Sequence, residues 1–471
     1  MAGRHAHLPL TSRIFYRESR FTLALGLPVA GAQLAQIAMQ VVDTLMAGNY
    51  GGTDLAGVAI GSSLFMPVFM LCAGILMAVN PIVAQLVGAR EHKNAGKNLR
   101  QGLWLSLILT IPAFLALRNA TPVMHLMGME AEVIHIADGY LKAVSWGTPA
   151  AFAFMTLRFF NEALGATRPP MFITILGLLF NIISNYTLIY GQWGMPELGG
   201  VGAGWATTIV FWVMFLTITL FTFTRPEYKK YRLLQDVKWP EIPYVREILR
   251  IGIPNGISSC MEVTLFSVTA LLMGSIGTTA VAGHQIAINI ASVTFMVALG
   301  LSTAVTVRVG QAIGRNSPHR ARLSGFTGIG LITAYMGLMA IVFITFPEQL
   351  AGLYTQETDI LGVAAQLLIL AAIFQISDGL QVSGLAALRG LKDTRIPMYV
   401  NFVAYWVIGI PLGYLLGIHL GIGPSGLWIG LIAGLTTAAL LHCFRFHLLS
   451  KKEVNSVEFD VPLSGSESVS R

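Results

Sequence analysis

Three carboxylates lie inside long apolar runs of the sequence, at Asp43, Glu262 and Asp378, whereas nearly all other acidic residues fall between the runs or near their ends. A charged side chain at the centre of a bilayer costs about 2.5–3.5 kcal/mol on insertion scales, so an acid at that depth indicates a functional site. No Lys or Arg is expected at a comparable depth in these runs. The pattern therefore predicts reversible binding of a proton or a small metal cation, and the alternative is a protonated acid that serves only helix packing.

Uncharged polar side chains occur at similar depths. Asn181 and Asn185 are one helical turn apart, which places two amides on one face of a helix. These amides either bond a neighbouring helix or supply oxygen atoms beside Asp43, and Thr207 could add a hydroxyl to the same group. His284 is a side chain type suited to proton relay, and the alternative is a hydrogen-bonded structural histidine.

The elements that must hold these groups are transmembrane helices. Of 471 residues, 54% are hydrophobic and 11% charged, against about 25% charged in an average soluble protein. The apolar runs are long enough to cross about 30 Å of hydrocarbon as helices, and they are too long and continuous for barrel strands. The expected fold is an all-α polytopic membrane protein with twelve transmembrane helices, at residues 22–48, 57–82, 99–118, 143–165, 170–191, 201–223, 250–274, 281–306, 323–346, 362–388, 398–418 and 425–447.

Basic residues collect in alternate connections. They precede the first span and follow the second, fourth, sixth, eighth, tenth and twelfth, at positions that include Arg20, Arg90, Arg168, Lys230, Arg315, Arg389 and Lys451. The positive-inside rule assigns these connections, and with them both termini, to the cytoplasm. The formal net charge of +7 then reflects contact with anionic lipid headgroups, and no nucleic-acid partner is expected.

The chain repeats itself at an offset of 226 positions. In this register Gly26 and Pro28 align with Gly252 and Pro254, and the Gln85 to Gly88 segment aligns with Gln311 to Gly314. Further on, Thr167-Arg-Pro-Pro-Met resembles Thr394-Arg-Ile-Pro-Met at an offset of 227. Each copy has six spans, so the copies share one orientation and are related by an axis along the membrane normal, as in transporters whose halves rock against each other.

This repeat divides the chain. Residues 1–224 are expected to form an N-lobe, 225–249 a cytoplasmic linker, 250–450 a C-lobe and 451–471 a disordered cytoplasmic tail. The sequence contains no phosphate-binding loop of the Walker type, no zinc-protease helix motif and no Gly-x-Ser-x-Gly elbow. We therefore expect neither an enzyme nor an ATP-driven pump, and no cofactor other than a coupling ion. One monovalent ion crossing 100 mV supplies about 2.3 kcal/mol.

Several of these segments together resemble a known family. The opening Gly26-Leu-Pro28, Val42-Asp-Thr44 with Met46-Ala-Gly48, and Ala282-Gly-His-Gln-Ile286 look like the multidrug and toxic compound extrusion (MATE) family, in its bacterial NorM-type branch. The similarity extends to about residue 450. It implies two bundles around a V-shaped cavity, in a monomer of the bacterial inner membrane that exports cationic amphiphilic drugs and dyes in exchange for Na⁺ or H⁺. An exporter of lipid-linked precursors or other polar metabolites of the same superfamily is the alternative function.

The resemblance also assigns roles to residues. Asp43, Asn181, Asn185 and Thr207 match an N-lobe cation or proton cluster, Glu262 and Asp378 match the C-lobe acids that are candidate Na⁺ ligands, and Pro28 matches a proline at which the first span can bend. Two positions depart from relatives: Asn185 replaces the second N-lobe acid of the archaeal branch, and Phe374 stands where sodium-linked members can present a tyrosine.

Aromatic and methionine side chains are the expected walls of the substrate cavity, because flexible apolar contacts suit binding of many different cations. The candidates occupy repeat-related positions on the second and eighth spans, at Phe65, Met66, Phe69, Phe295 and Met296. Ordinary helix packing is the alternative interpretation.

Overall fold

The computed structural model describes residues 10–235 and 239–459, and these residues form helices and short connections without a strand. The first half contains α1 (Leu10–Tyr50), α2 (Gly52–Leu76), α3 (Val79–Gly88), α4 (His92–Arg118), α5 (Thr121–Leu126), α6 (Ala131–Ser145), α7 (Thr148–Ala163), α8 (Arg168–Ile189), η1 (Gln192–Gly194) and α9 (Gly200–Thr224). The second contains η2 (Pro226–Tyr231), α10 (Ile242–Ile276), α11 (Thr278–Gly314), α12 (Pro318–Thr345), α13 (Pro347–Gly352), α14 (Thr358–Gly390), α15 (Arg395–Phe402), η3 (Val403–Gly409), α16 (Ile410–Tyr414), η4 (Leu415–His419) and α17 (Pro424–Phe459).

Eleven segments of the described residues are helical, long and apolar enough to cross a membrane, and they coincide with eleven of the predicted spans. The remaining prediction, 143–165, falls on a helix that is divided at Trp146 and Gly147 into α6 and α7. Pro149 explains the division, because proline lacks an amide hydrogen and its ring clashes with the carbonyl four residues earlier in a continuous helix. The prediction of an all-α polytopic membrane fold is confirmed.

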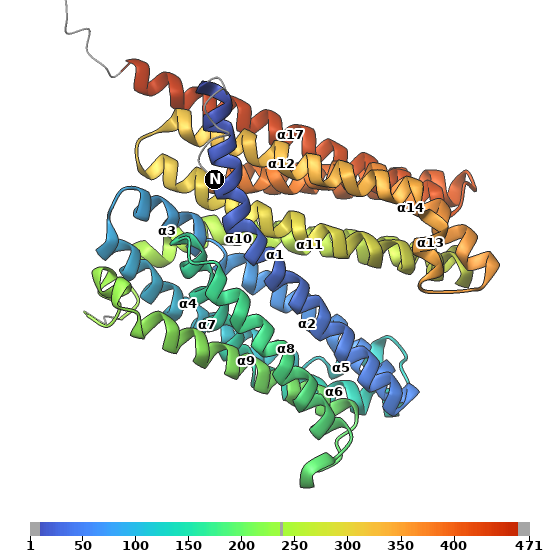
Figure 1. Ribbon diagram of the computed structural model, residues 1–471. Helices are drawn as coiled ribbons and strands as arrows, with labels where there is room; N and C mark the ends of the chain where they lie inside the picture. Colours follow the sequence, from blue (N-terminus) through green and yellow to red (C-terminus); the bar gives the residue numbers. More distant parts are fainter. Residues whose placement is uncertain (1–9, 236–238, 460–471) are drawn as a thin grey trace, which may run out of the picture.

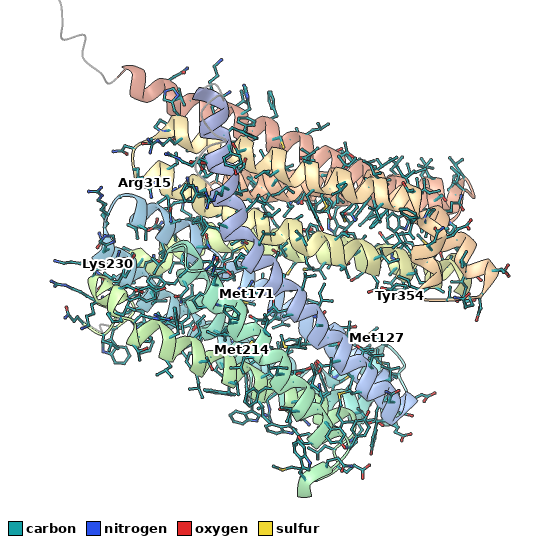
Figure 2. All side chains as sticks on the ribbon, in the orientation of Figure 1. Met127, Met171, Met214, Lys230, Arg315 and Tyr354 are labelled. Carbon is teal, nitrogen blue, oxygen red and sulfur yellow. The ribbon has the colours of Figure 1, made fainter. Side chains whose placement is uncertain are left out.

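The helices form two bundles that lie close together at one end and diverge toward the other, so that the molecule has the shape of a V (Figure 1). Lys230 and Arg315 lie at the closed end, and Met127 and Tyr354 lie toward the diverging end (Figure 2). The connections rich in Lys and Arg are at the closed end, which we call the basic end. The other is called the open end.

Two helix pairs related by the repeat join the bundles. α1 packs along α11, and α10 packs along α2. The contacts are close because small residues face each other: a Cβ atom on Gly74 of α2 would lie 2.5 Å from the Cα atom of Gly256 in α10, and a Cβ atom on Gly300 of α11 would overlap Ala30 of α1. Gly74 and Gly300 are equivalent in the repeat, as are Ala30 and Gly256, so one packing solution is used twice.

Proline stands inside both of the helices that cross between the bundles, at Pro28 in α1 and at Pro254 in α10. Each helix continues through its proline. The missing backbone hydrogen bond at such a position is a place where a helix can bend, and the hinge role of Pro28 stays a prediction.

Two boundaries differ from the sequence prediction. α10 begins at Ile242, inside the predicted linker 225–249, and α17 continues to Phe459, past residue 450 where a disordered tail was predicted. Both differences have one cause: apolar composition marks where hydrocarbon ends, whereas a helix can continue into the headgroup region on polar residues. The rest of the predicted tail, 460–471, lies outside the described residues.

We expect Gly74→Ala to lower the midpoint of thermal unfolding of the purified protein, because the added methyl group meets backbone atoms of α10. Gly330→Ala is the matched control: this glycine is also inside a helix, and its Cβ would have no atom within 4 Å. Alanine favours a helix over glycine by about 1 kcal/mol at either site. Equal melting of the two variants would contradict the proposed closeness of α2 and α10.

Candidate functional site

The N-lobe group consists of Asp43 on α1 and two amides on α8. The Nδ2 atoms of Asn181 and Asn185 both donate to Oδ1 of Asp43, at 2.9 and 2.6 Å. Both asparagines are buried, at 2% and 0% exposure, and their Oδ1 atoms have no partner among the described residues. The structure thus brings together three of the four N-lobe residues proposed from the sequence, with the acid of α1 held by one face of α8.

Thr207, the fourth residue, is placed beside this group and bonded elsewhere. Its hydroxyl donates to the carbonyl of Ala203 in its own helix at 2.9 Å. Its side chain also meets the hydroxyl of Tyr140, a buried residue on which the charge of Asp43 acts. Tyr140 was not found from the sequence, because α6 lies ahead of the predicted fourth span and nothing in its pattern marks this ring as facing α1.

The C-lobe group surrounds Glu262 of α10 and Asp378 of α14. The charges of the two acids act on each other and on the hydroxyl of Tyr405 in the π-helical segment η3. Gln381 donates to that hydroxyl at 2.8 Å. Asp378 is 4% exposed, and its Oδ1 atom has no hydrogen-bond partner among the described residues. Asp378 is therefore buried with an oxygen atom free to accept, and Glu262, whose charge acts on it, is half-buried on α10.

One basic residue, Arg389, also acts on this group, although no ion pair joins it to an acid among the described residues. Arg389 lies in α14, which runs past the predicted end of its span, and its charge acts on Glu262. Its Nε atom donates to Oδ1 of Asn255 at 2.6 Å, and Asn255 in turn donates to the carbonyl of Gly74 at 2.9 Å. The sequence predicts a loop at Arg389, because the apolar run of the tenth span ends at residue 388 and a basic residue just after it is typical of the membrane interface.

Phe374 and His284 lie close to this site and are engaged in packing. Phe374 is buried against the rings of Phe266 and Trp428. The Nε1 atom of Trp428 donates to Nδ1 of His284 at 3.2 Å, which agrees with the structural interpretation of that histidine.

The predicted cavity residues occupy two kinds of environment. Phe65 and Phe69 are buried inside the N-lobe, where Phe69 stacks on Phe152 and Phe211. In this conformation Phe65 and Phe69 therefore serve helix packing, which was the alternative to lining the cavity. The side chains of Met66, Phe295 and Met296 are half-buried.

Two hydrogen bonds between the bundles close the basic end. Gln85 on α3 donates to the carbonyl of Gly390 on α14 at 2.9 Å, and Gln311 on α11 donates to the carbonyl of Ala163 on α7 at 3.0 Å. The glutamines are equivalent in the repeat at an offset of 226, and the acceptors are equivalent at 227. We call this repeated pair of bonds the glutamine latch.

A salt bridge adds to the same closure. Glu18 near the start of α1 accepts from Arg308 on α11, with its Oε1 atom 2.6 Å from one terminal guanidinium nitrogen, and is 5% exposed. The first helix of the N-lobe is thereby fixed to the C-lobe at the basic end.

Two facing helical bundles related by a tandem repeat, with Asp43 in one and Glu262 and Asp378 in the other, define an integral membrane protein of the polytopic helical class. The sequence matches the MatE family over residues 28–187 and 254–415, and the chain belongs to this family. It is 42% identical over 432 residues to the multidrug resistance protein MdtK of Proteus mirabilis (strain HI4320), a match that covers 91% of this chain and 94% of that protein. The resemblance seen in the motifs is confirmed.

Solved structures share the fold. The eukaryotic MATE transporter AtDTX14 superposes with a TM-score of 0.85 at 21% identity, over 94% of this chain and 99% of that chain. A MATE structure described as the bent conformation has the same TM-score and identity over 96% and 99% of the two chains. A MATE structure described as the straight conformation also reaches 0.85, over 93% and 97%.

The N-lobe bonds lead to a prediction about stability. Asp43→Leu leaves two buried amides without their acceptor, so the free energy of unfolding should fall by about 1–3 kcal/mol. Asp43→Asn keeps an oxygen acceptor and should cost less. Thermal unfolding in one detergent, followed by tryptophan fluorescence, measures both. Equal melting of the leucine and asparagine variants would mean that the two bonds contribute nothing to stability.

Proposed function

We propose that the chain is a secondary active exporter of cationic amphiphilic drugs and dyes, which exchanges them for Na⁺ or H⁺. The observation that carries the proposal is that each half of a V-shaped repeat holds an acid beside a buried oxygen without a hydrogen-bond partner among the described residues: the amide oxygens of Asn181 and Asn185 next to Asp43, and Oδ1 of Asp378 itself. Membership of the MatE family supports it, as does the name of the Proteus mirabilis relative, a multidrug resistance protein. On this proposal the protein acts as a monomer, without nucleic acid and without catalytic chemistry.

Charge balance explains why each group would take one cation. In the C-lobe, two carboxylates against one guanidinium leave one negative charge when Glu262 and Asp378 are both ionised, and one H⁺ or Na⁺ neutralises it. In the N-lobe, the amides of Asn181 and Asn185 stabilise the charge of Asp43 without cancelling it. The atoms that could bind a cation in both groups are oxygens. Oxygen ligands suit a proton or a hard cation and not a soft transition metal.

Exchange follows if the ion and the drug compete for the same negative charge. A carboxylate that has released its ion attracts a cationic drug, and a carboxylate that has taken up an ion no longer does. A gradient of about 2.3 kcal/mol per charge at 100 mV would be enough to shift such a two-state group by about fifty-fold. The ion gradient would then be converted into outward movement of the drug.

The glutamine latch supports alternating access as the means of movement. In this structure the bonds of Gln85 and Gln311 hold the basic end closed while the bundles diverge at the open end. Because the repeat axis relates the two bonds, one rocking motion of the bundles would break both. Pro28 and Pro254 are the positions in the crossing helices where bending would absorb the motion.

Transport by single variants tests the proposal. Asp43→Asn and Asp378→Asn should each reduce gradient-driven drug transport to background, because each removes an ionisable group, while Glu357→Gln at an exposed loop position should transport normally. The assay is uptake of a cationic dye by inverted vesicles under an imposed Na⁺ or H⁺ gradient. Dye binding without a gradient shows that a variant is folded. Full transport by both acid variants would refute coupling through these groups.

A second test concerns orientation. We propose a bacterial inner membrane with both termini and the basic end in the cytoplasm, on the strength of the positive-inside rule. In a background without Cys72, Cys260 and Cys443, single cysteines at the open end should react with an impermeant maleimide in intact cells, and single cysteines at the basic end should react only after lysis. The open-end positions are Gly52, Glu197 and Glu357, and the basic-end positions are Lys93, Lys230 and His319. Labelling at position 230 in intact cells would reverse the proposed orientation.

A further inference from the structure

The structure contains a hollow that the buried carboxylates do not explain. It has a volume of about 990 Å³ and lies at the basic end, along the first turns of α10 and against the start of α15. A second hollow of about 310 Å³ adjoins it and shares Glu247, Arg250 and Arg395 with it. The larger volume falls within the range of small-molecule sites. Neither hollow is lined by Asp43, Glu262 or Asp378.

The charged side chains around the hollow leave an excess of positive charge. Both acids that line the two volumes are already engaged, Glu247 with Lys392 at 2.8 Å and Asp393 with Arg445 at 2.5 Å. Three arginines remain around the larger hollow without a carboxylate partner among the described residues: Arg246 and Arg250, one turn apart on α10, and Arg395 at the start of α15. All three side chains are exposed. A guanidinium group binds phosphate through two parallel hydrogen bonds.

The other walls are apolar, and the surroundings are those of a membrane interface. Leu249 lies between the two arginines of α10 and Ile253 lies one turn nearer the centre of the helix, where it is 43% exposed. Trp239, just ahead of α10, is 81% exposed and stacks on Trp104 with ring centroids 5.8 Å apart. Exposed tryptophans mark the level of lipid headgroups. The hollow therefore lies where arginine can meet a headgroup and leucine and isoleucine can meet an acyl chain.

We propose that this hollow is a binding site for an anionic phospholipid of the leaflet at the basic end. Arg250 and Arg395 bind the phosphate, Arg246 faces the outer part of the headgroup, and the first carbons of an acyl chain lie along Leu249 and Ile253. A zwitterionic phospholipid fits the same volume but leaves the surplus positive charge unmatched. The lipid would then bridge α10 and the start of α15, two helices of the C-lobe.

Native mass spectrometry of the full chain, released from neutral detergent, tests the site. Phosphatidylglycerol should bind at least about tenfold more tightly than phosphatidylethanolamine, because each basic residue at an anionic surface contributes roughly a fivefold preference. Arg250→Gln with Arg395→Gln should remove the preference. Arg315→Gln with Arg320→Gln, an exposed pair at the same end that does not line the hollow, should retain it.

Three results would overturn the proposal: equal binding of the two lipids by the unmodified chain, an unchanged preference in the Arg250 and Arg395 variant, or displacement of phosphatidylglycerol by glycerol 3-phosphate at equal concentration. The last would show that the site takes a free phosphate compound and not a lipid. If the double variant does not fold, the unmodified chain still decides the matter. Its preference for phosphatidylglycerol should fall as the salt concentration rises, because salt screens exposed charges. A preference that does not depend on salt would also overturn the proposal.

Discussion

The structure depends on the cost of keeping an ionised carboxylate away from water. An acid in hydrocarbon must be neutralised, hydrogen-bonded or paired, and this chain uses a different mixture of these in each half. In the N-lobe the partners are uncharged, because Asn181 and Asn185 donate to one oxygen of Asp43. In the C-lobe the charge of Arg389 acts on Glu262 without an ion pair, and an oxygen of Asp378 has no hydrogen-bond partner in the part of the chain that the structure describes. The helices and their repeat serve to place these groups at depth.

The two halves are thus alike in backbone and unlike in chemistry. The latch and the glycine contacts follow the repeat, since Gln85 matches Gln311 and Gly74 matches Gly300 in both sequence and contact. The cation groups do not follow it. Asp43 has no acidic counterpart in α10, and position 162, a glutamate that pairs with Arg158 at 2.8 Å, is the repeat equivalent of Arg389. The repeat has kept the contacts between its halves in common, while the acidic groups inside each half differ.

The sequence predicts the helices and the two bundles well, and it predicts individual side-chain contacts poorly. Long apolar runs, the offset of 226 and the alternation of basic loops are enough to predict the all-α fold and its two bundles, and the two asparagines one turn apart indicate a face toward Asp43. Tyr405 and Arg389 were missed for a physical reason. Nothing in the sequence tells how far a helix continues beyond its apolar stretch, or which way a ring in a π-helical segment points. Phe65 and Phe69 were proposed as cavity walls because composition cannot separate an inner face from a packed interior.

The division between α6 and α7 means that two short helices, and not one long helix, cross the membrane at this point of the N-lobe. α7 has 16 residues, which at about 1.5 Å per residue span about 24 Å, less than the roughly 30 Å of an average hydrocarbon core. At the division, the indole nitrogen of Trp212 donates to the carbonyl of Trp146 at 3.1 Å, and both rings are exposed. Because Tyr140 of α6 lies beside Asp43, the two short helices cross the hydrocarbon together, and their division lies between them. The indole of Trp212 thus gives a backbone carbonyl a side-chain donor where the regular helix is interrupted, as backbone polar groups in a membrane require.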